Sequence, residues 1–193
     1  MNATSLVFND KIESWKVSNV TNMNYTFYGC ESFNQDIGNW DVSNVTDTSF
    51  MFGQATSFDQ DISSWDVSNV TDMTQMFVNA NSFNQDIGKW DVSNVTDMQS
   101  LFLLALSFNQ DIGNWDVSEV TTMWSLFSAD EHGVGEAGKQ FNADLSTWEV
   151  SNVTDMGYMF EGAECFDSNL SSWNVKKVKK MTNMFSGAKK FNF

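Results

Sequence analysis

Aromatic residues recur along this chain at a nearly constant interval. Tryptophans stand 25 residues apart, except for one interval of 33, at Trp15, Trp40, Trp65, Trp90, Trp115, Trp148 and Trp173. Phenylalanines keep the same intervals, at Phe8, Phe33, Phe58, Phe83, Phe108, Phe141, Phe166 and Phe191. A fixed period of roughly 20 to 50 residues indicates a repeat architecture. The sequence therefore predicts a single repeat domain over residues 1–193, with about seven units.

The first half of the unit alternates apolar and polar residues. The unit reads F-N-Q-D-I-x-x-W-D-V-S-N-V-T-D-M-x-x-M-F-x-x-A-x-S. In residues 33–37 the apolar ends Phe33 and Ile37 flank a polar stretch, and this pattern favours a short β-strand. Asn34 and Asp36 are expected on the solvent face of that strand.

The second half follows a different period. Val70, Met73, Phe77 and Ala80 fall at positions i, i+3, i+7 and i+10, which predicts the apolar stripe of a short helix. One strand and one helix cannot bury their apolar faces alone, so the units are predicted to stack into an α/β solenoid with parallel strands. A left-handed residue is expected near the end of each helix, at Gly29, Asn79, Gly162 and Gly187.

The interval of 33 residues locates an insertion. Its extra residues fall in ADEHGVGEAGKQ, residues 129–140, whose glycines and charges predict a loop. Alternatively, this segment contacts a ligand or one metal ion through Asp130, Glu131, His132 and Glu136. His132 is the only histidine, and paired carboxylates recur on every unit, whereas an active site breaks a repeat at one place. The protein is therefore predicted not to be an enzyme.

The consensus run F-N-Q-D-I-G-N-W-D-V-S-N-V-T-D-M, followed by M-F, resembles the repeat of bacterial and protist surface lipoproteins related to BspA-like leucine-rich-repeat proteins. The resemblance covers nearly the whole chain, from Phe8 to Phe193. It implies a leucine-rich-repeat-like right-handed solenoid, an extracellular or cell-surface location, and a role in adhesion; it implies no catalysis. The signal or lipid-anchored cysteine common at the start of such proteins is not expected in this chain.

Charge narrows the choice of partner. The chain has 25 acidic residues against ten lysines and a net charge of -15, so nucleic acid and anionic membranes are poor partners. No stretch approaches the roughly 18 apolar residues of a transmembrane helix. Cys30 and Cys165 are predicted to be unpaired core thiols, because distant rungs of a repeat stack lie beyond disulfide reach.

Two polar columns on the predicted strand face are the candidate binding residues. They are Asn34, Asp36, Asp59, Asp61, Asn84, Asp86, Asn109, Asp111, Asn142 and Asp144. Stacked carboxylates repel, and a calcium ion between rungs relieves that repulsion, so calcium is a possible cofactor. Alternatively, these aspartates accept hydrogen bonds in turns. A further acidic set after each tryptophan, Asp41, Asp66, Asp91, Asp116 and Glu149, is expected to fix turns or to lie near helix starts, where negative charge is favoured.

The last unit differs from the others. Residues 174–193 contain six of the ten lysines and no acid, which leaves a net charge of -21 on the rest of the chain. These lysines are expected either to form a polar cap or to favour head-to-tail assembly into a filament; a third alternative is that the chain is part of a longer array of repeats. The leading prediction is an extracellular or cell-surface repeat protein that binds a protein or glycan across its repetitive face, and the alternative is a structural subunit that assembles end to end.

Overall fold

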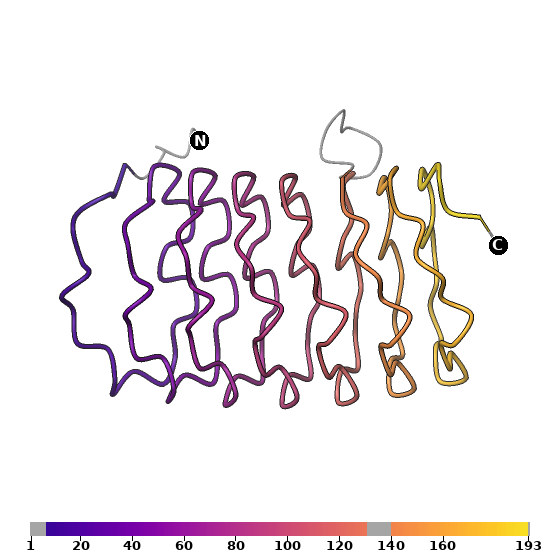
Figure 1. The fold of residues 1–193 in the computed structure, drawn as a ribbon, viewed down its shortest axis with the longest axis horizontal. Helices are drawn as coiled ribbons and strands as arrows, with labels where there is room; N and C mark the ends of the chain where they lie inside the picture. Colours follow the sequence, from indigo (N-terminus) through magenta and orange to yellow (C-terminus); the bar gives the residue numbers. More distant parts are fainter. Residues whose placement is uncertain (1–6, 131–139, 193) are drawn as a thin grey trace.

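The protein is a row of stacked coils, one for each repeat unit (Figure 1). The computed structural model describes residues 7–130 and 140–192. We number the coils 1 to 7 along the chain: residues 8–32, 33–57, 58–82, 83–107, 108–140, 141–165 and 166–190. Within the described ranges there is no helix and no extended strand. Regular pairing is confined to isolated parallel bridges, one between each two successive coils, at Asn22, Asp47, Asp72, Asp97, Thr122, Asp155 and Lys180.

The prediction of an α/β solenoid with a helix in each unit is wrong, because the second half of each unit forms a run of tight turns. Gln75 and Asn79 have positive φ angles of 53° and 56°, which interrupt any right-handed helix. Backbone N–H groups alternate in direction along this run. Those of Gln75 and Phe77 donate to carbonyls of coil 4, at 2.9 and 3.0 Å, whereas those of Met76 and Val78 donate three residues back. We call residues 23–30 and their equivalents the zigzag segment.

The stripe of apolar residues in this half is nevertheless buried as expected. Met73, Met76, Phe77 and Ala80 are fully buried. The positions predicted to be left-handed are confirmed, because Gly29, Asn79, Gly162 and Gly187 all have positive φ. Burial of these positions therefore follows from their facing the stack interior, and it does not require a helix.

The predicted strand at residues 33–37, with its leucine-rich-repeat-like parallel sheet, is also wrong. Residues 33–37 are irregular, and so are their equivalents in the other coils. Here a side chain replaces the backbone acceptor that a parallel sheet requires. The backbone N–H of Asn34 donates to Asn9 Oδ1 at 2.9 Å, and the N–H of Asp59 donates to Asn34 Oδ1 at 3.0 Å. Bridges occur instead at the position of Asp47, immediately before the zigzag segment.

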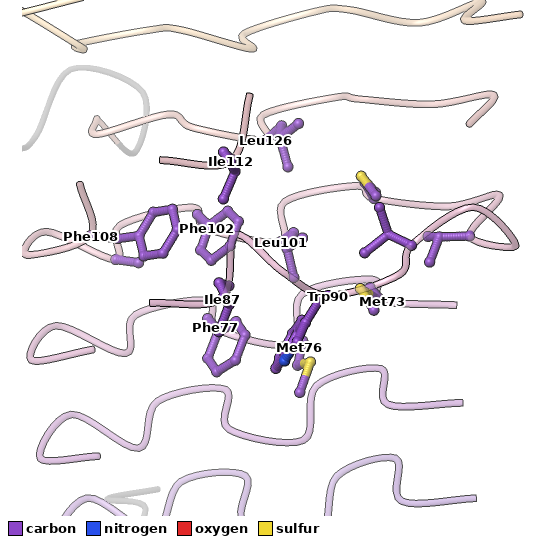
Figure 2. Close-up of a cluster of buried hydrophobic side chains, with 14 of the residues drawn as sticks. Met73, Met76, Phe77, Ile87, Trp90, Leu101, Phe102, Phe108, Ile112 and Leu126 are labelled. Atoms are coloured by element: carbon purple, nitrogen blue, oxygen red, sulfur yellow. The ribbon is translucent and has the colours of Figure 1, made fainter. Parts of the chain in front are cut away.

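Two parallel columns of phenylalanine rings run through the core, which also contains buried isoleucine, valine, methionine and tryptophan side chains. In one column Phe52, Phe77 and Phe102 stack with centroids 5.6 and 5.7 Å apart, and in the other Phe83 and Phe108 are 6.0 Å apart. The columns touch, since Phe102 lies 3.9 Å from Phe108. Figure 2 shows Phe77, Phe102 and Phe108 with the side chains of Ile87 and Trp90 nearby. Each coil therefore buries its apolar surface mainly against the coils before and after it.

Tryptophan side chains join successive coils by hydrogen bonds. The indole N–H of Trp90 donates to the carbonyl of Ile62 at 3.1 Å, and Trp90 is buried. The same bond recurs at Trp40, Trp65, Trp115, Trp148 and Trp173. A buried hydrogen bond of this kind contributes about 1 kcal/mol to stability. The invariant tryptophan is thus both a core residue and a link between coils.

Both cysteines are free thiols, as predicted. Cys30 is buried in the core, where desolvation raises its pKa above the ordinary value for a thiol. Cys165 is only partly buried.

Candidate functional site

Within the zigzag segment, four positions change from coil to coil, while the others in that segment are nearly constant. They are the positions of Asn24, Tyr25, Tyr28 and Gly29 in the first coil, all within the zigzag segment. The position of Tyr25, for example, holds Phe50, Gln75, Ser100, Ser125, Tyr158 and Asn183 in the following coils. We call these four columns the variable face. It is a continuous part of the structure in which side-chain chemistry differs along the stack.

The residue just before each zigzag segment, an aspartate in coils 2, 3, 4 and 6, orients the variable face. Asp72 Oδ1 accepts the backbone N–H of Thr74 at 2.8 Å, and Asp97 Oδ1 accepts that of Gln99 at 2.8 Å. This turn, in which a side chain accepts the N–H two residues ahead, fixes where the backbone changes direction. The variable side chains therefore project from a backbone that is the same in each coil.

One aromatic cluster lies on the variable face of coils 1 and 2. Tyr25 stacks on Phe50 with centroids 4.4 Å apart, and it contacts the edge of Tyr28 at 5.4 Å. The hydroxyl of Tyr28 accepts the side-chain amide of Gln54 at 2.9 Å. Gly53 makes room for this ring, because a Cβ there would lie 2.8 Å from Tyr28 Cδ2. Tyr25 is 51% exposed, so the cluster presents aromatic surface to solvent.

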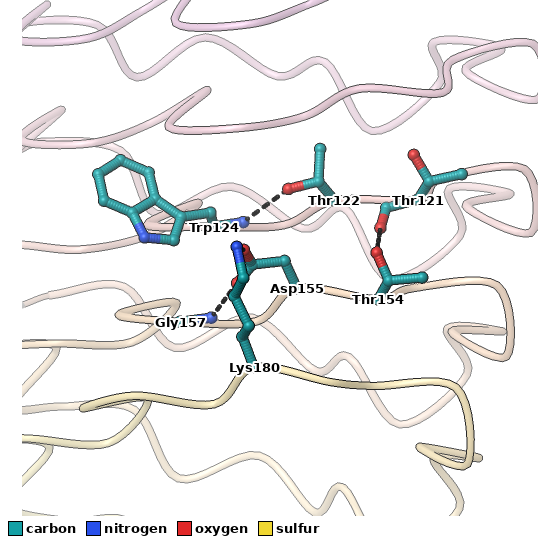
Figure 3. A network of polar contacts seen from close by, with 7 residues as sticks. All are labelled: Thr121, Thr122, Trp124, Thr154, Asp155, Gly157 and Lys180. Carbon is teal, nitrogen blue, oxygen red and sulfur yellow. Dashed lines mark hydrogen bonds and ion pairs between the residues drawn. The ribbon is translucent and has the colours of Figure 1, made fainter.

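A second aromatic cluster lies on coils 5 and 6. Figure 3 shows one of its rings, Trp124, together with Asp155, Gly157 and Lys180. Trp124 contacts Tyr158 edge to face at 5.8 Å, and a Cβ at Gly157 would lie 3.1 Å from Trp124 Cδ1. Asp155 accepts the backbone N–H of Gly157 at 3.0 Å and pairs with Lys180 Nζ at 3.1 Å. Trp124 and Tyr158 are both partly exposed. Each cluster thus combines aromatic rings with a glycine that accommodates one of them.

The aspartates predicted to bind a ligand are engaged in turns, which is the alternative that the sequence left open. Asp36 Oδ1 accepts the backbone N–H of Gly38 at 3.0 Å, and Asp144 Oδ1 accepts that of Ser146 at 2.9 Å. The same bond forms at Asp61, Asp86 and Asp111. These carboxylates are exposed, and a binding role for them stays a prediction.

The second predicted binding column links coils to one another. Oδ1 of Asp59 accepts the backbone N–H of Asn84 at 2.9 Å and the amide of Gln85 at 2.7 Å. Equivalent backbone bonds are accepted by Asn34, Asn84, Asn109 and Asn142. One oxygen of each side chain is therefore committed to the next coil. A role for this column in ligand binding also stays a prediction.

The acidic set that follows each tryptophan fixes turns, which is one of the two predicted roles; the other, a place near helix starts, is wrong because the described residues contain no helix. Asp66 Oδ1 accepts both the hydroxyl of Ser68 at 2.6 Å and its backbone N–H at 3.1 Å. These bonds, the hydroxyl first, lower the pKa of Asp66. Asp41 and Asp116 show the same shift for the same reason.

The insertion contributes little to the description of a site. Glu131, His132 and Glu136 lie outside the described residues, and so does most of the predicted loop at 129–140. In the part of the chain that is described, no group of three histidine, cysteine, aspartate or glutamate side chains is placed to hold a metal ion. Residues 7–130 and 140–192 also contain no helix long and apolar enough to cross a membrane.

The fold and the variable face define a tandem-repeat protein whose coils share one backbone and differ in one set of side chains. The model of one protein family matches the chain in three overlapping sections, residues 1–86, 60–135 and 130–193. The chain belongs to this family, which is described as Mycoplasma protein of unknown function, DUF285. No curated protein matches the sequence.

Sequence reasoning did not find the variable face. The signal was present, because the unit contains the unassigned positions in M-x-x-M-F-x-x-A. A glycine that directly follows an aromatic residue in the same column, as Gly53 follows Tyr28, indicates a ring lying over the next coil. Assigning these positions to a helix hid that relation, since helical periodicity spreads them around an axis.

Proposed function

We propose that this is a non-catalytic repeat protein that binds another macromolecule, a protein or a glycan, at a cell surface or outside the cell. The observation that carries the proposal is the variable face, with its aromatic clusters around Tyr28 and Trp124. Tyrosine and tryptophan dominate binding surfaces because they supply large contact areas with few rotatable bonds. The repeat's resemblance to surface lipoproteins supports the location and a role in adhesion.

Two further features support this reading over an enzymatic one. The polar groups of the constant columns recur in each coil and bond to their own turn or to the next coil, as Asp36 and Asn34 do. The net charge of -15 disfavours polyanionic partners, so we propose a neutral glycan or a protein surface as the ligand.

Substitution on the variable face tests the proposal. Binding is measured by surface plasmon resonance against immobilised neutral oligosaccharides and purified extracellular-matrix proteins. We expect Trp124→Ala and Tyr28→Ala to weaken binding at least tenfold, as loss of a central aromatic contact does. Asp111→Asn is the matched control on the constant columns. Loss of binding in Asp111→Asn with full binding in both aromatic variants would place the site on the predicted aspartate column instead.

A second candidate function is assembly of the chain end to end. It is favoured by apolar side chains exposed at both ends of the stack, among them Trp15 at 55% and Met181 at 45%. The charge distribution along the chain supports it as well: six lysines and no acid lie in residues 174–193, whereas residues 1–173 carry a net charge of -21.

A further inference from the structure

The two ends of the stack expose backbone groups that join coils in its interior. In coil 6, the N–H groups of Met156, Tyr158 and Gly162 donate to carbonyls of coil 7 at 2.9, 2.7 and 2.7 Å. The equivalent N–H groups of coil 7, at Met181, Asn183 and Gly187, bond to no acceptor in residues 7–130 or 140–192. At the other end, the coil 1 carbonyls of Asn22, Asn24, Thr26 and Tyr28 accept no bond from the described residues. Their equivalents in coil 2 each accept a backbone N–H of coil 1.

The last coil also leaves an apolar hollow. It has a volume of about 710 Å³ and is lined by Leu170, Trp173, Val175, Met181 and Met184, among others. Val175 and Met181 are 40% and 45% exposed, although their equivalents in coils 3 to 6 are buried by the following coil. The hollow therefore has the lining that each interior coil presents to its successor.

We propose that coil 1 of a second copy of this chain docks on coil 7 of the first, in the register that joins interior coils. This inference rests on the end-to-end assembly proposed above, and it specifies the surfaces that form the contact between two copies. Donors at one end meet acceptors at the other, and the hollow receives the apolar side chains of coil 1. Because the two surfaces are different, the contact does not close on itself, and repeated addition gives a filament.

Trp15 specifies this register. In residues 7–130 and 140–192, its indole N–H has no acceptor, whereas the other six tryptophans of its column each donate to the preceding coil. Trp173 donates to Leu145 at 2.9 Å, so the next carbonyl in the series is that of Leu170. Leu170 lines the terminal hollow. An incoming Trp15 in register therefore meets the acceptor that its column uses throughout the stack.

The charges of the two ends fit the same register. Lys189 pairs with Glu164 at 2.8 Å, and the next position in that column of an added coil is Glu31. The other lysines at coil 7 positions meet uncharged residues: Lys176, Lys177, Lys179, Lys180 and Lys190 meet Ser18, Asn19, Thr21, Asn22 and Ser32. No column brings two lysines together, although coil 1 contains two lysines of its own.

Docking requires that Phe191 and Asn192 of the first copy replace Phe8 and Asn9 of the second. Phe191 already occupies the position that Phe8 holds in coil 1, stacking on Phe166 at 5.8 Å. The second copy therefore adds from Lys11 onward, and its Phe8 and Asn9 leave their places. Phe191 and Asn192 have the same residue types as Phe8 and Asn9, so they restore similar contacts. Exchange of identical groups between copies costs little free energy.

Sedimentation velocity on the chain across concentration and salt tests the contact. We expect the mean mass to rise with concentration and to fall at high salt, because salt screens the lysine-rich end. Trp15→Phe keeps a ring and removes the indole N–H, and it should raise the dissociation constant about fivefold. Trp40→Phe is the matched control, which removes an interior bond and should lower the melting temperature without this effect on association.

Charge exchange provides an independent readout. Glu31→Lys and Lys189→Glu should each weaken association, and the double variant should restore it. A chain that stays monomeric at every concentration overturns both the contact and end-to-end assembly. Association that is insensitive to Trp15→Phe and to both charge reversals overturns this register alone, and leaves end-to-end assembly through other contacts.

Discussion

Replacing Gln75 by glycine distinguishes the zigzag segment from the helix that the sequence predicts. Gln75 has a φ of 53°, and this left-handed conformation costs a residue with a Cβ roughly 1–2 kcal/mol. Glycine avoids that cost but loses about 0.5–1 kcal/mol through the entropy of the unfolded chain. We therefore expect Gln75→Gly to raise the free energy of unfolding by about 0.5–1 kcal/mol. Inside a helix, the same substitution would lower it by about 1 kcal/mol.

Thr74→Gly is the matched control for this experiment. Thr74 is the preceding residue and is equally half-buried, but its φ is not positive. Glycine there relieves no strain, so the free energy of unfolding should fall by about 1 kcal/mol. Both variants are measured by urea denaturation, followed by tryptophan fluorescence. If Gln75→Gly destabilises the chain as much as Thr74→Gly does, the reasoning from backbone conformation is refuted.

Three further predictions concern the core, the turns and calcium. Phe83→Ala should lower the free energy of unfolding by about 3–5 kcal/mol. Phe8→Ala should lower it by less, because Phe8 is only partly buried. Equal losses of stability for the two variants in thermal melts would contradict a core formed between coils. Ser68→Ala should raise the pKa of Asp66, measured by NMR titration, because the hydroxyl bond is the main cause of its depression. The lowered pKa of Asp66 stabilises the folded state at pH values above the ordinary aspartate pKa of about 3.9, and this stabilisation is lost as the pH falls through the lower folded-state pKa. The variant should therefore lose less stability than the parent chain over that pH range. An unchanged dependence of stability on acidic pH would count against this. We expect the same melting temperature in chelator and in millimolar calcium, because each aspartate of the Asp36 column already bonds to its own turn; a rise with calcium would instead support the cation site.

The repeat and its buried positions could be predicted from the sequence, whereas its secondary structure could not. Trp90 and Phe83 are buried at the expected period because each coil presents the same face to its neighbours. A spacing of three and four residues matched a helix, but a run of turns that reverses direction every few residues gives similar spacing. The distinguishing quantity is the sign of φ. The sequence does not indicate a positive φ at Phe50 and Leu104, because residues with bulky side chains rarely have one.

The predicted strand failed for a different physical reason. The alternation in residues 33–37 was real, since Phe33 and Ile37 are buried and Asn34 is exposed. Alternation reports which side faces the core, but it does not report which atom accepts the backbone hydrogen bond. Here the acceptor is the side-chain oxygen of an asparagine or aspartate in the preceding coil, as Asn9 is for Asn34. Only the recurrence of Asn or Asp at this one position indicated that arrangement.

Constancy within this repeat therefore has a structural cause, and function has to be sought where the units differ. The column of Asn94 shows how much the frame tolerates: its amide donates to the carbonyl of Ser68 at 2.7 Å. Glu119 interrupts this column, and a glutamate carboxylate offers no such donor, yet Asn152 resumes it by donating to Ser118 at 2.7 Å. Since one missing bond of about 1 kcal/mol leaves the neighbouring coils in register, the frame is redundant. A redundant frame leaves the four variable columns free to diverge, which is the condition for recognising a particular partner.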